Sequence, residues 1–169
     1  MDFKVLKVSN LSLDDNQTIH YTNAKNEKKK LEIVTPLLHL PFGIDKDTKM
    51  NYYLNLQLRK TNCNNHNHEL FLFLKFLESI ESFIKTETGK EVQSVIRKTP
   101  KYDTIINTKV LKNYNKLITE TFKGPENFNF FNLKSGMNLK AQLIIDKIWE
   151  YNDKIFYKLK IQKLFLESV

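Results

Sequence analysis

Cysteine, proline and glycine are scarce in this sequence of 169 residues, which contains one Cys, four Pro and four Gly. The single cysteine, Cys63, excludes a disulfide framework within one chain and is typical of proteins from a reducing compartment. Because Pro and Gly are so few, there is no obvious linker between folding units, and the sequence shows no internal repeat. The sequence therefore predicts a single domain, residues 1–169.

Long hydrophobic runs are also missing. The longest, residues 70–74, is far too short to cross a membrane. The first residues, 1–4, are not followed by the apolar stretch that a secretory signal requires. We therefore expect a soluble protein of the cytoplasm with no membrane partner.

The motifs of common enzyme classes are absent as well. There is no glycine-rich phosphate loop, no nucleophile elbow and no helix-borne His/Glu metal pair. Cys63, His66 and His68 are three possible metal ligands close together, but zinc normally takes a fourth ligand, and no partner pair with suitable spacing stands elsewhere. The sequence therefore predicts a protein that is not an enzyme, with no catalytic residues, no metal and no cofactor.

Positive charge and apolar residues are both plentiful. The net charge of +8 and the pI near 9.4 attract polyanionic partners, and the hydrophobic content of 41% is enough for a folded core. All basic residues except Arg59 and Arg97 are lysine. Since Lys, Asn, Ile, Phe and Tyr have AT-rich codons, the base composition of the gene is an alternative source of this basicity. The position of the charges is therefore more informative than their number.

Seven or eight short strands and one main helix are predicted. The helix covers residues 68–85, where apolar side chains recur at intervals of three and four, and Gly89 ends it. The clearest strand covers residues 51–60, where apolar and polar side chains alternate. Further strands are expected at 3–8, 18–22, 31–34, 37–40, 104–111, 117–122 and within 137–168. Short strands with one inserted helix indicate a mainly β fold, a small β-barrel with the helix packed against it.

The C-terminal segment, residues 137–168, is predicted to form a β-hairpin with two different faces. Asn152 and Asp153 both tolerate positive φ and suit a two-residue turn, which pairs Trp149 with Phe156. The same register pairs Ile148 with Tyr157 and Lys147 with Lys158. Because side chains alternate across a strand, one face is a core face: Ile144, Ile148, Ile155, Tyr157, Leu159 and Ile161. The other face holds two aromatic residues among three lysines: Lys147, Trp149, Phe156, Lys158 and Lys160.

Aromatic rings among ammonium groups are suited to single-stranded nucleic acid, because bases stack on the rings and phosphates bind the cations. Trp149 and Phe156 are therefore candidate stacking residues, and the three lysines of the same face are candidate phosphate ligands. The alternative is a buried cross-strand aromatic pair, with lysine stems covering it. Three ammonium groups cannot be buried unpaired, and this weighs against full burial of that face.

A change of phase within the same segment predicts a bend. Apolar residues fall on odd positions from Leu139 to Leu143 but on even positions from Ile148 onward. Such a shift, centred on residues 144–146, is what a β-bulge produces, and bulges bend strands at the corners of barrels. Asp146 falls on the core face at this point. We expect it to be either a structural hydrogen-bond acceptor or rotated outward by the bulge.

Three short segments follow one another along the chain: Pro41-Phe42-Gly43, then Ile96-Arg97-Lys98 with Tyr102-Asp103, then Ile148-Trp149 in the hairpin. Their order and content resemble those of the OB-fold-like single-stranded DNA-binding proteins of large nucleocytoplasmic DNA viruses and yeast cytoplasmic linear plasmids. The similarity covers roughly residues 35–166. It implies an OB-fold-like barrel, a role in viral or plasmid-type replication in the host cytoplasm, and replication proteins as further partners.

The resemblance also extends the candidate site. It adds four residues to the groove beside Trp149: Arg97, Lys98, Lys101 and Tyr102. Without the resemblance, residues 97–101 are an ordinary solvated loop. Tyr53 and Arg59 lie on the polar face of strand 51–60 and are further candidates, although Tyr53 is equally well explained as a surface tyrosine.

The sequence departs from the family in two places. The turn between Tyr151 and Phe156 lacks the Gly of the relatives, which leaves its type open, and the C-terminus lacks the acidic tail of many replication single-strand binders. The sequence as a whole predicts a sequence-tolerant single-stranded DNA-binding protein. Two alternatives use the same residues: binding of single-stranded RNA, and a structural or scaffold subunit of a viral or replication assembly. The oligomeric state is open.

Overall fold

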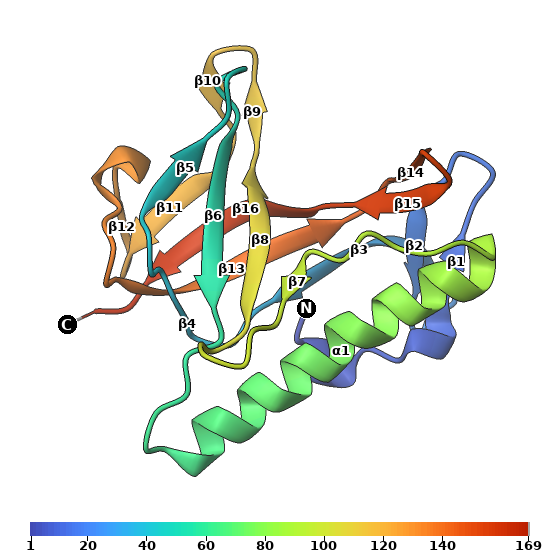
Figure 1. Cartoon of the computed structure of the whole chain (residues 1–169), viewed down its shortest axis with the longest axis horizontal. Helices are drawn as coiled ribbons and strands as arrows, with labels where there is room; N and C mark the ends of the chain where they lie inside the picture. The colour runs from blue at the N-terminus through green and yellow to red at the C-terminus, as the bar shows by residue number, and fades with distance from the viewer. Residues whose placement is uncertain (169) are drawn as a thin grey trace.

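The computed structural model describes residues 1–168, and a closed barrel of five strands forms its centre (Figure 1). The barrel strands are β4 (Leu38–His39), β6 (Tyr52–Gln57), β8 (Ile105–Val110), β13 (Asn138–Ile145) and β16 (Leu159–Leu166). Around the barrel they follow the order β4-β6-β8-β16-β13 and back to β4. β8 and β16 run parallel, and all other neighbours are antiparallel. This five-stranded closed arrangement is OB-fold-like and confirms the predicted fold class.

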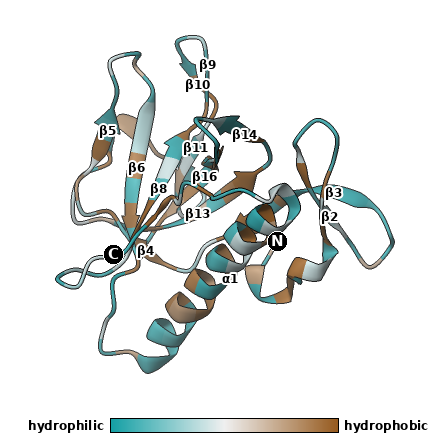
Figure 2. Cartoon of the chain, turned by 45° about the vertical axis from the view of Figure 1, so that its right-hand side comes forward, coloured by the Kyte–Doolittle hydropathy of each residue, from teal (hydrophilic) through white to brown (hydrophobic). Residues whose placement is uncertain are grey.

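The remaining strands extend this barrel. β3 (Lys28–Val34) pairs with the second half of β13 and continues through β2 (Ile19–Thr22) to β1 (Leu11–Leu13). β5 (Ile44–Lys46) pairs with β6, β7 (Ile96–Arg97) with β8, and β11 (Glu120–Lys123) with β16 and β12 (Glu126–Asn127). Two hairpins complete the set, β9–β10 (Lys112–Asn113 and Lys116–Leu117) and β14–β15 (Ile148–Tyr151 and Lys154–Tyr157). Figure 2 shows β13 as largely hydrophobic and β9–β10 as largely hydrophilic.

The helix α1 (Asn64–Thr88) lies along one side of the barrel (Figure 1). It begins earlier and ends later than the predicted 68–85, and Gly89 ends it as expected, with φ of 69° and its N–H bonded to the Lys85 carbonyl. Its buried residues are Leu70, Phe73, Phe76, Leu77, Ile80 and Ile84, whereas Leu74 and Phe83, which also belong to the predicted apolar stripe, are half-buried. No helix within residues 1–168 is long and apolar enough to cross a membrane.

The predicted strand at residues 3–8 is wrong. The segment forms two 3₁₀ turns, η1 (Phe3–Val5) and η2 (Val8–Asn10), and Phe3 packs on Phe73 and Phe76 of α1 with ring centroids 5.2 Å and 6.0 Å away. Phe3 and Leu6 are both buried. Residues three apart lie on one side of a 3₁₀ turn, so this spacing buries both side chains, whereas a strand would place them on opposite faces.

The predicted shift of the core residues from odd to even positions exists, but it lies slightly later in the chain. Leu143 and Ile145 are fully buried and Ile148 is buried, so Ile145 and not Ile144 belongs to the core face. The reason is that the backbone at residues 146–148 bonds to the start of β2: Ile19 N–H donates to the Asp146 carbonyl at 2.7 Å. A bulge also occurs, but on the opposite strand, where the register with β13 skips Gln162.

The predicted hairpin register is confirmed. Trp149 pairs with Phe156, and Ile148 with Tyr157. Asn152 and Asp153 have φ of 50° and 62°, so a type I′ turn forms without the Gly of the resembled family. The predicted pairing of Lys147 with Lys158 is wrong, because the ladder ends at Ile148–Tyr157 and Lys147 bridges Thr18 instead.

Candidate nucleic-acid interface

The outer face of β6 and β8 carries a polar strip. Three cross-strand pairs place Tyr53 beside Lys109, Asn55 beside Asn107, and Gln57 beside Ile105. The Asn107 amide donates to the Asn55 side-chain oxygen at 3.0 Å. We call Tyr53, Asn55, Gln57, Asn107 and Lys109 the central strip. β6 and β8 are the second and third strands of the barrel, and it is this face that binds oligonucleotides in OB-folds.

A hollow of about 450 Å³ lies at one end of the central strip, between β7 and the β14–β15 hairpin. We call it the hairpin hollow; its lining includes Arg97, Asn107, Lys109, Trp149, Phe156 and Lys158. The rings of Trp149 and Phe156 stack with centroids 5.9 Å apart and planes 18° apart. Trp149 is 41% exposed and Phe156 is half-buried. The pair is therefore an accessible aromatic surface and not part of the core.

Lys158 joins the hairpin hollow to the central strip. Its ammonium lies 5.5 Å from the ring centroid of Tyr53 and 5.8 Å from that of Trp149, within the range of cation–π attraction. Partial burial, followed by the charge of Lys109, lowers the pKa of Lys158 below its ordinary value. The two lysines thus present a concentrated positive charge between aromatic rings.

The hairpin is held in place from the side of α1. Gln93 N–H donates to the Ile155 carbonyl at 2.7 Å, and Ile155 N–H donates to the Glu91 carbonyl at 2.8 Å. The buried Tyr157 hydroxyl donates to Glu81 of α1. In the turn, Asp153 pairs with Lys90 at 3.1 Å. These bonds fix the aromatic pair before any ligand arrives, which lowers the cost of ordering it on binding.

Two of the predicted lysines lie at the base of the hairpin. Lys160 forms an ion pair with Asp146 at 2.9 Å. Burial is the largest single effect and would raise the pKa of Asp146, but the hydrogen bonds from Lys160 and the Lys147 backbone N–H and the charge of Lys160 together outweigh it, and the pKa is lowered. Asp146 is thus a structural acceptor, one of the two predicted roles, and Lys160 is partly neutralised. Lys147 is exposed beside Thr18.

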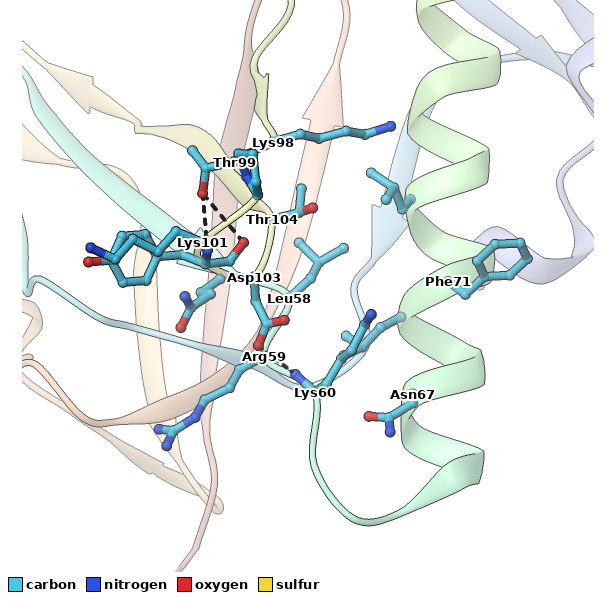
Figure 3. A pocket seen from close by; sticks show the side chains of 15 residues that line it. Leu58, Arg59, Lys60, Asn67, Phe71, Lys98, Thr99, Lys101, Asp103 and Thr104 are labelled. Atoms are coloured by element: carbon cyan, nitrogen blue, oxygen red, sulfur yellow. Dashed lines mark hydrogen bonds between the residues drawn. The ribbon is translucent and has the colours of Figure 1, made fainter.

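A larger hollow of about 840 Å³ lies between the loop at residues 98–104 and α1 (Figure 3). We call it the loop hollow. Leu58, Leu70 and Leu74 contribute apolar lining. Among its basic residues, Lys98 reaches across to α1 and pairs with Glu78 at 2.6 Å, whereas Lys101 points away from α1 (Figure 3).

The predicted site residues therefore separate into groups. Trp149, Phe156, Lys158 and Arg97 meet at the hairpin hollow, and Tyr53 lies next to them on the central strip. The loop hollow brings together the remaining loop candidates and one residue that follows β6: Arg59, Lys98, Lys101 and Tyr102. Tyr102 is 65% exposed, with the Lys101 ammonium 5.9 Å from its ring. Gln57 lines the loop hollow and also belongs to the central strip, so the two hollows lie on one continuous surface.

Sequence reasoning missed the polar residues of β8. Asn107 and Lys109 alternate with buried Ile106, Thr108 and Val110, so the pattern alone marks them as outward-facing. Their place beside Tyr53 and Lys158 depends on pairings between strands far apart in the sequence, which no local pattern reveals.

Cys63, His66 and His68 make separate contacts in the structure. Cys63 is exposed at the start of α1, the His66 ring lies 3.3 Å from the Arg59 carbonyl oxygen, and His68 stacks on Phe71. In the part of the chain that the structure describes, no three His, Cys, Asp or Glu side chains are placed to hold a metal ion.

Comparison with known proteins yields matches by structure only. The sequence matches no family model and no curated protein. The fold is similar to that of the single-stranded DNA-binding protein from bacteriophage Enc34, with a TM-score of 0.58 and 9% identity over 94% of this chain and 89% of that chain. The Enc34 protein in complex with single-stranded DNA gives a TM-score of 0.53 and 11% identity over 94% of each chain.

A second phage protein has the same overall arrangement. It is gp2.5, a single-stranded DNA-binding protein encoded by bacteriophage T7, with a TM-score of 0.54 and 11% identity over 82% of this chain and 86% of that chain. The narrower resemblance to proteins of large DNA viruses and yeast linear plasmids stays a prediction. At these identities the likeness shows the fold alone: the OB-fold-like barrel of this chain is similar in fold to these phage single-stranded DNA-binding proteins.

Proposed function

We propose that this protein binds single-stranded DNA, with little sequence preference, on the surface that joins the hairpin hollow, the central strip and the loop hollow. The observation that carries the proposal is the accessible Trp149–Phe156 stack beside Lys158, Lys109 and Arg97, on the barrel face that binds oligonucleotides in OB-folds. The phage proteins of similar fold support it, since they are single-stranded DNA-binding proteins by description.

In the proposed mechanism, aromatic rings bind the bases and positively charged side chains bind the phosphates. Bases stack on Trp149 and Phe156, and every base has a π-face, so this contact is tolerant of sequence. Lysine and arginine side chains neutralise phosphates and release bound counterions, so affinity falls as salt rises. The amides of Asn55 and Asn107, which bond to each other in the free protein, can hydrogen-bond to the strand where it crosses the central strip.

Viral or plasmid-type replication, with the protein covering exposed single strands and meeting replication proteins, is the setting we propose for this binding. It rests on the resemblance of the three ordered segments and on the phage origin of the structures of similar fold. Nothing in the chemistry of the site requires a reaction, so the proposed activity is binding without catalysis.

Fluorescence anisotropy with labelled oligo(dT) tests this proposal. We expect salt-sensitive binding that unlabelled oligo(dT) displaces and a duplex of the same length displaces poorly. Oligo(U) as a competitor separates DNA from RNA, because the 2′-hydroxyl is what distinguishes the two. Equal competition by single strands and duplex, or no salt-sensitive binding, contradicts the proposal and favours a scaffold subunit that meets an acidic protein.

A further inference from the structure

Lys158 and Lys109 lie near each other in the hairpin hollow, beside two aromatic rings. The Lys158 ammonium faces the rings of both Tyr53 and Trp149, at 5.5 Å and 5.8 Å. Lys109 is the cross-strand partner of Tyr53, and Lys160 follows as the partner of Lys109 on β16. Two barrel strands, β6 and β8, and the hairpin therefore bring the two rings and the two lysines together.

These two lysines have no carboxylate partner, in contrast to three nearby lysines. Lys160 pairs with Asp146, Lys98 with Glu78, and Lys90 with two acids of the hairpin. Within residues 1–168 no acidic side chain lies within ion-pair distance of Lys109 or Lys158. Both are only half-exposed, so water screens their mutual repulsion incompletely.

The charged and titratable groups around Lys158 come from five elements. They are Tyr53 on β6, Lys109 on β8, Lys160 on β16, Arg97 on β7, and Asp47 in the turn between β5 and β6. The carboxylate of Asp47 is engaged by Asn51, whose side chain donates to it at 3.0 Å, and by the Tyr53 hydroxyl at 3.3 Å. The net charge around the two lysines is positive, and an anion placed between them relieves the repulsion between their ammonium groups.

We propose that Lys109 and Lys158 together bind one phosphodiester of the strand, with the two flanking bases stacked on Trp149 and Tyr53. This inference rests on the proposed function and names the ligand unit of that site, a dinucleotide step with its internal phosphate. The lysines supply charge at the centre and the rings supply flat surfaces on both sides. When a base stacks, the Lys158 ammonium moves from the ring faces to the phosphate.

Two consequences distinguish this subsite from scattered phosphate contacts. First, the two lysines share one phosphate, so removing both lowers the counterion release on binding by the amount for one phosphate contact and not for two. Second, the bound phosphate favours the charged form of Lys158, whose pKa in the free protein is held low by burial and by Lys109. Binding at alkaline pH therefore takes up protons.

The test uses Lys109→Met, Lys158→Met and the double variant, because methionine keeps most of the packing of the lysine stem. For oligo(dT), the slope of log affinity against log salt should change by well under ~0.7 in each single variant, because the remaining lysine still neutralises the shared phosphate. In the double variant it should become shallower by about 0.7, the value for one phosphate of a single strand. Lys25→Met, at an exposed lysine in the turn between β2 and β3 that lines neither hollow, is the matched control for removal of one positive charge.

Calorimetry in two buffers of different ionisation enthalpy measures the proton uptake. We expect uptake at alkaline pH in the wild type and its loss in Lys158→Met. Slopes that fall by about 1.4 in the double variant, as two independent phosphates require, overturn the shared subsite. Absence of proton uptake also overturns it. In both cases the wild type still binds oligo(dT), so the proposed function stands; if the wild type does not bind, the proposed function itself fails.

Discussion

Replacing Trp149 with alanine removes the larger ring of the aromatic stack in the hairpin hollow. One base stacked on an aromatic side chain contributes about 1–3 kcal/mol, so we expect the dissociation constant for oligo(dT) to rise about 5- to 150-fold. The cost to folding is smaller. A cross-strand aromatic pair contributes roughly 0.2–1 kcal/mol, and Trp149 is already 41% exposed. Because this residue is the only tryptophan, binding is measured by anisotropy of a labelled oligonucleotide.

The chain contains a matched control for this substitution. Phe165 stacks on Phe122 with centroids 5.8 Å apart and planes 18° apart, nearly the geometry of the Trp149 pair, and is 37% exposed. It lies beyond the bulge of β16 and lines neither hollow. Phe165→Ala should therefore cost a similar amount of stability and leave the dissociation constant unchanged. An equal loss of affinity in the two variants, or none in Trp149→Ala, refutes the stacking role.

Three further predictions concern the turn between β5 and β6, the hydrogen bond that anchors the β14–β15 hairpin to α1, and the loop hollow. The pKa of Asp47 is lowered to about 2, mainly by hydrogen bonds from Asn51. The ionised Asp47 carboxylate therefore stabilises the fold fully above its unfolded-state pKa of 3.8, and this stabilisation is lost as pH falls toward 2. The difference in unfolding free energy between wild type and Asp47→Asn should shrink over that range. Tyr157→Phe removes the hydrogen bond to Glu81 and should cost about 1.5–3 kcal/mol in urea unfolding, with weaker oligo(dT) binding. Tyr102→Ala should weaken binding of oligonucleotides near the upper end of the ~4–16 nucleotide range of OB-fold sites and leave the shortest unaffected.

The β14–β15 hairpin could be predicted because residues close together in the sequence determine its turn and register. Asn152 and Asp153 select the turn, the turn fixes the register, and the register separates the core face from the face with Trp149. The end of α1 at Gly89 is local in the same sense, since a left-handed residue satisfies the last carbonyl groups of the helix.

The features that sequence reasoning missed depend on distant segments. Lys109 meets Lys158 only because β8 joins β16 in parallel, across a connection that contains six short strands and β13. Ile145 replaces Ile144 in the core because the backbone at Asp146 bonds to the start of β2. The loop hollow likewise needs α1 and residues 98–104 to meet. Alternation in a sequence identifies faces, but tertiary pairing decides which faces adjoin.

The intrinsic fluorescence of Trp149 tests most directly whether single-stranded DNA binds at the hairpin hollow. Titration with oligo(dT) at 50 mM and at 200 mM salt should quench the fluorescence to saturation, with a markedly weaker midpoint at the higher salt. A duplex of the same length should produce little quenching at equal concentration. Binding of oligo(dT) by anisotropy with the fluorescence unchanged would place the DNA elsewhere on the molecule, and no salt-sensitive binding by either signal would contradict the proposed function.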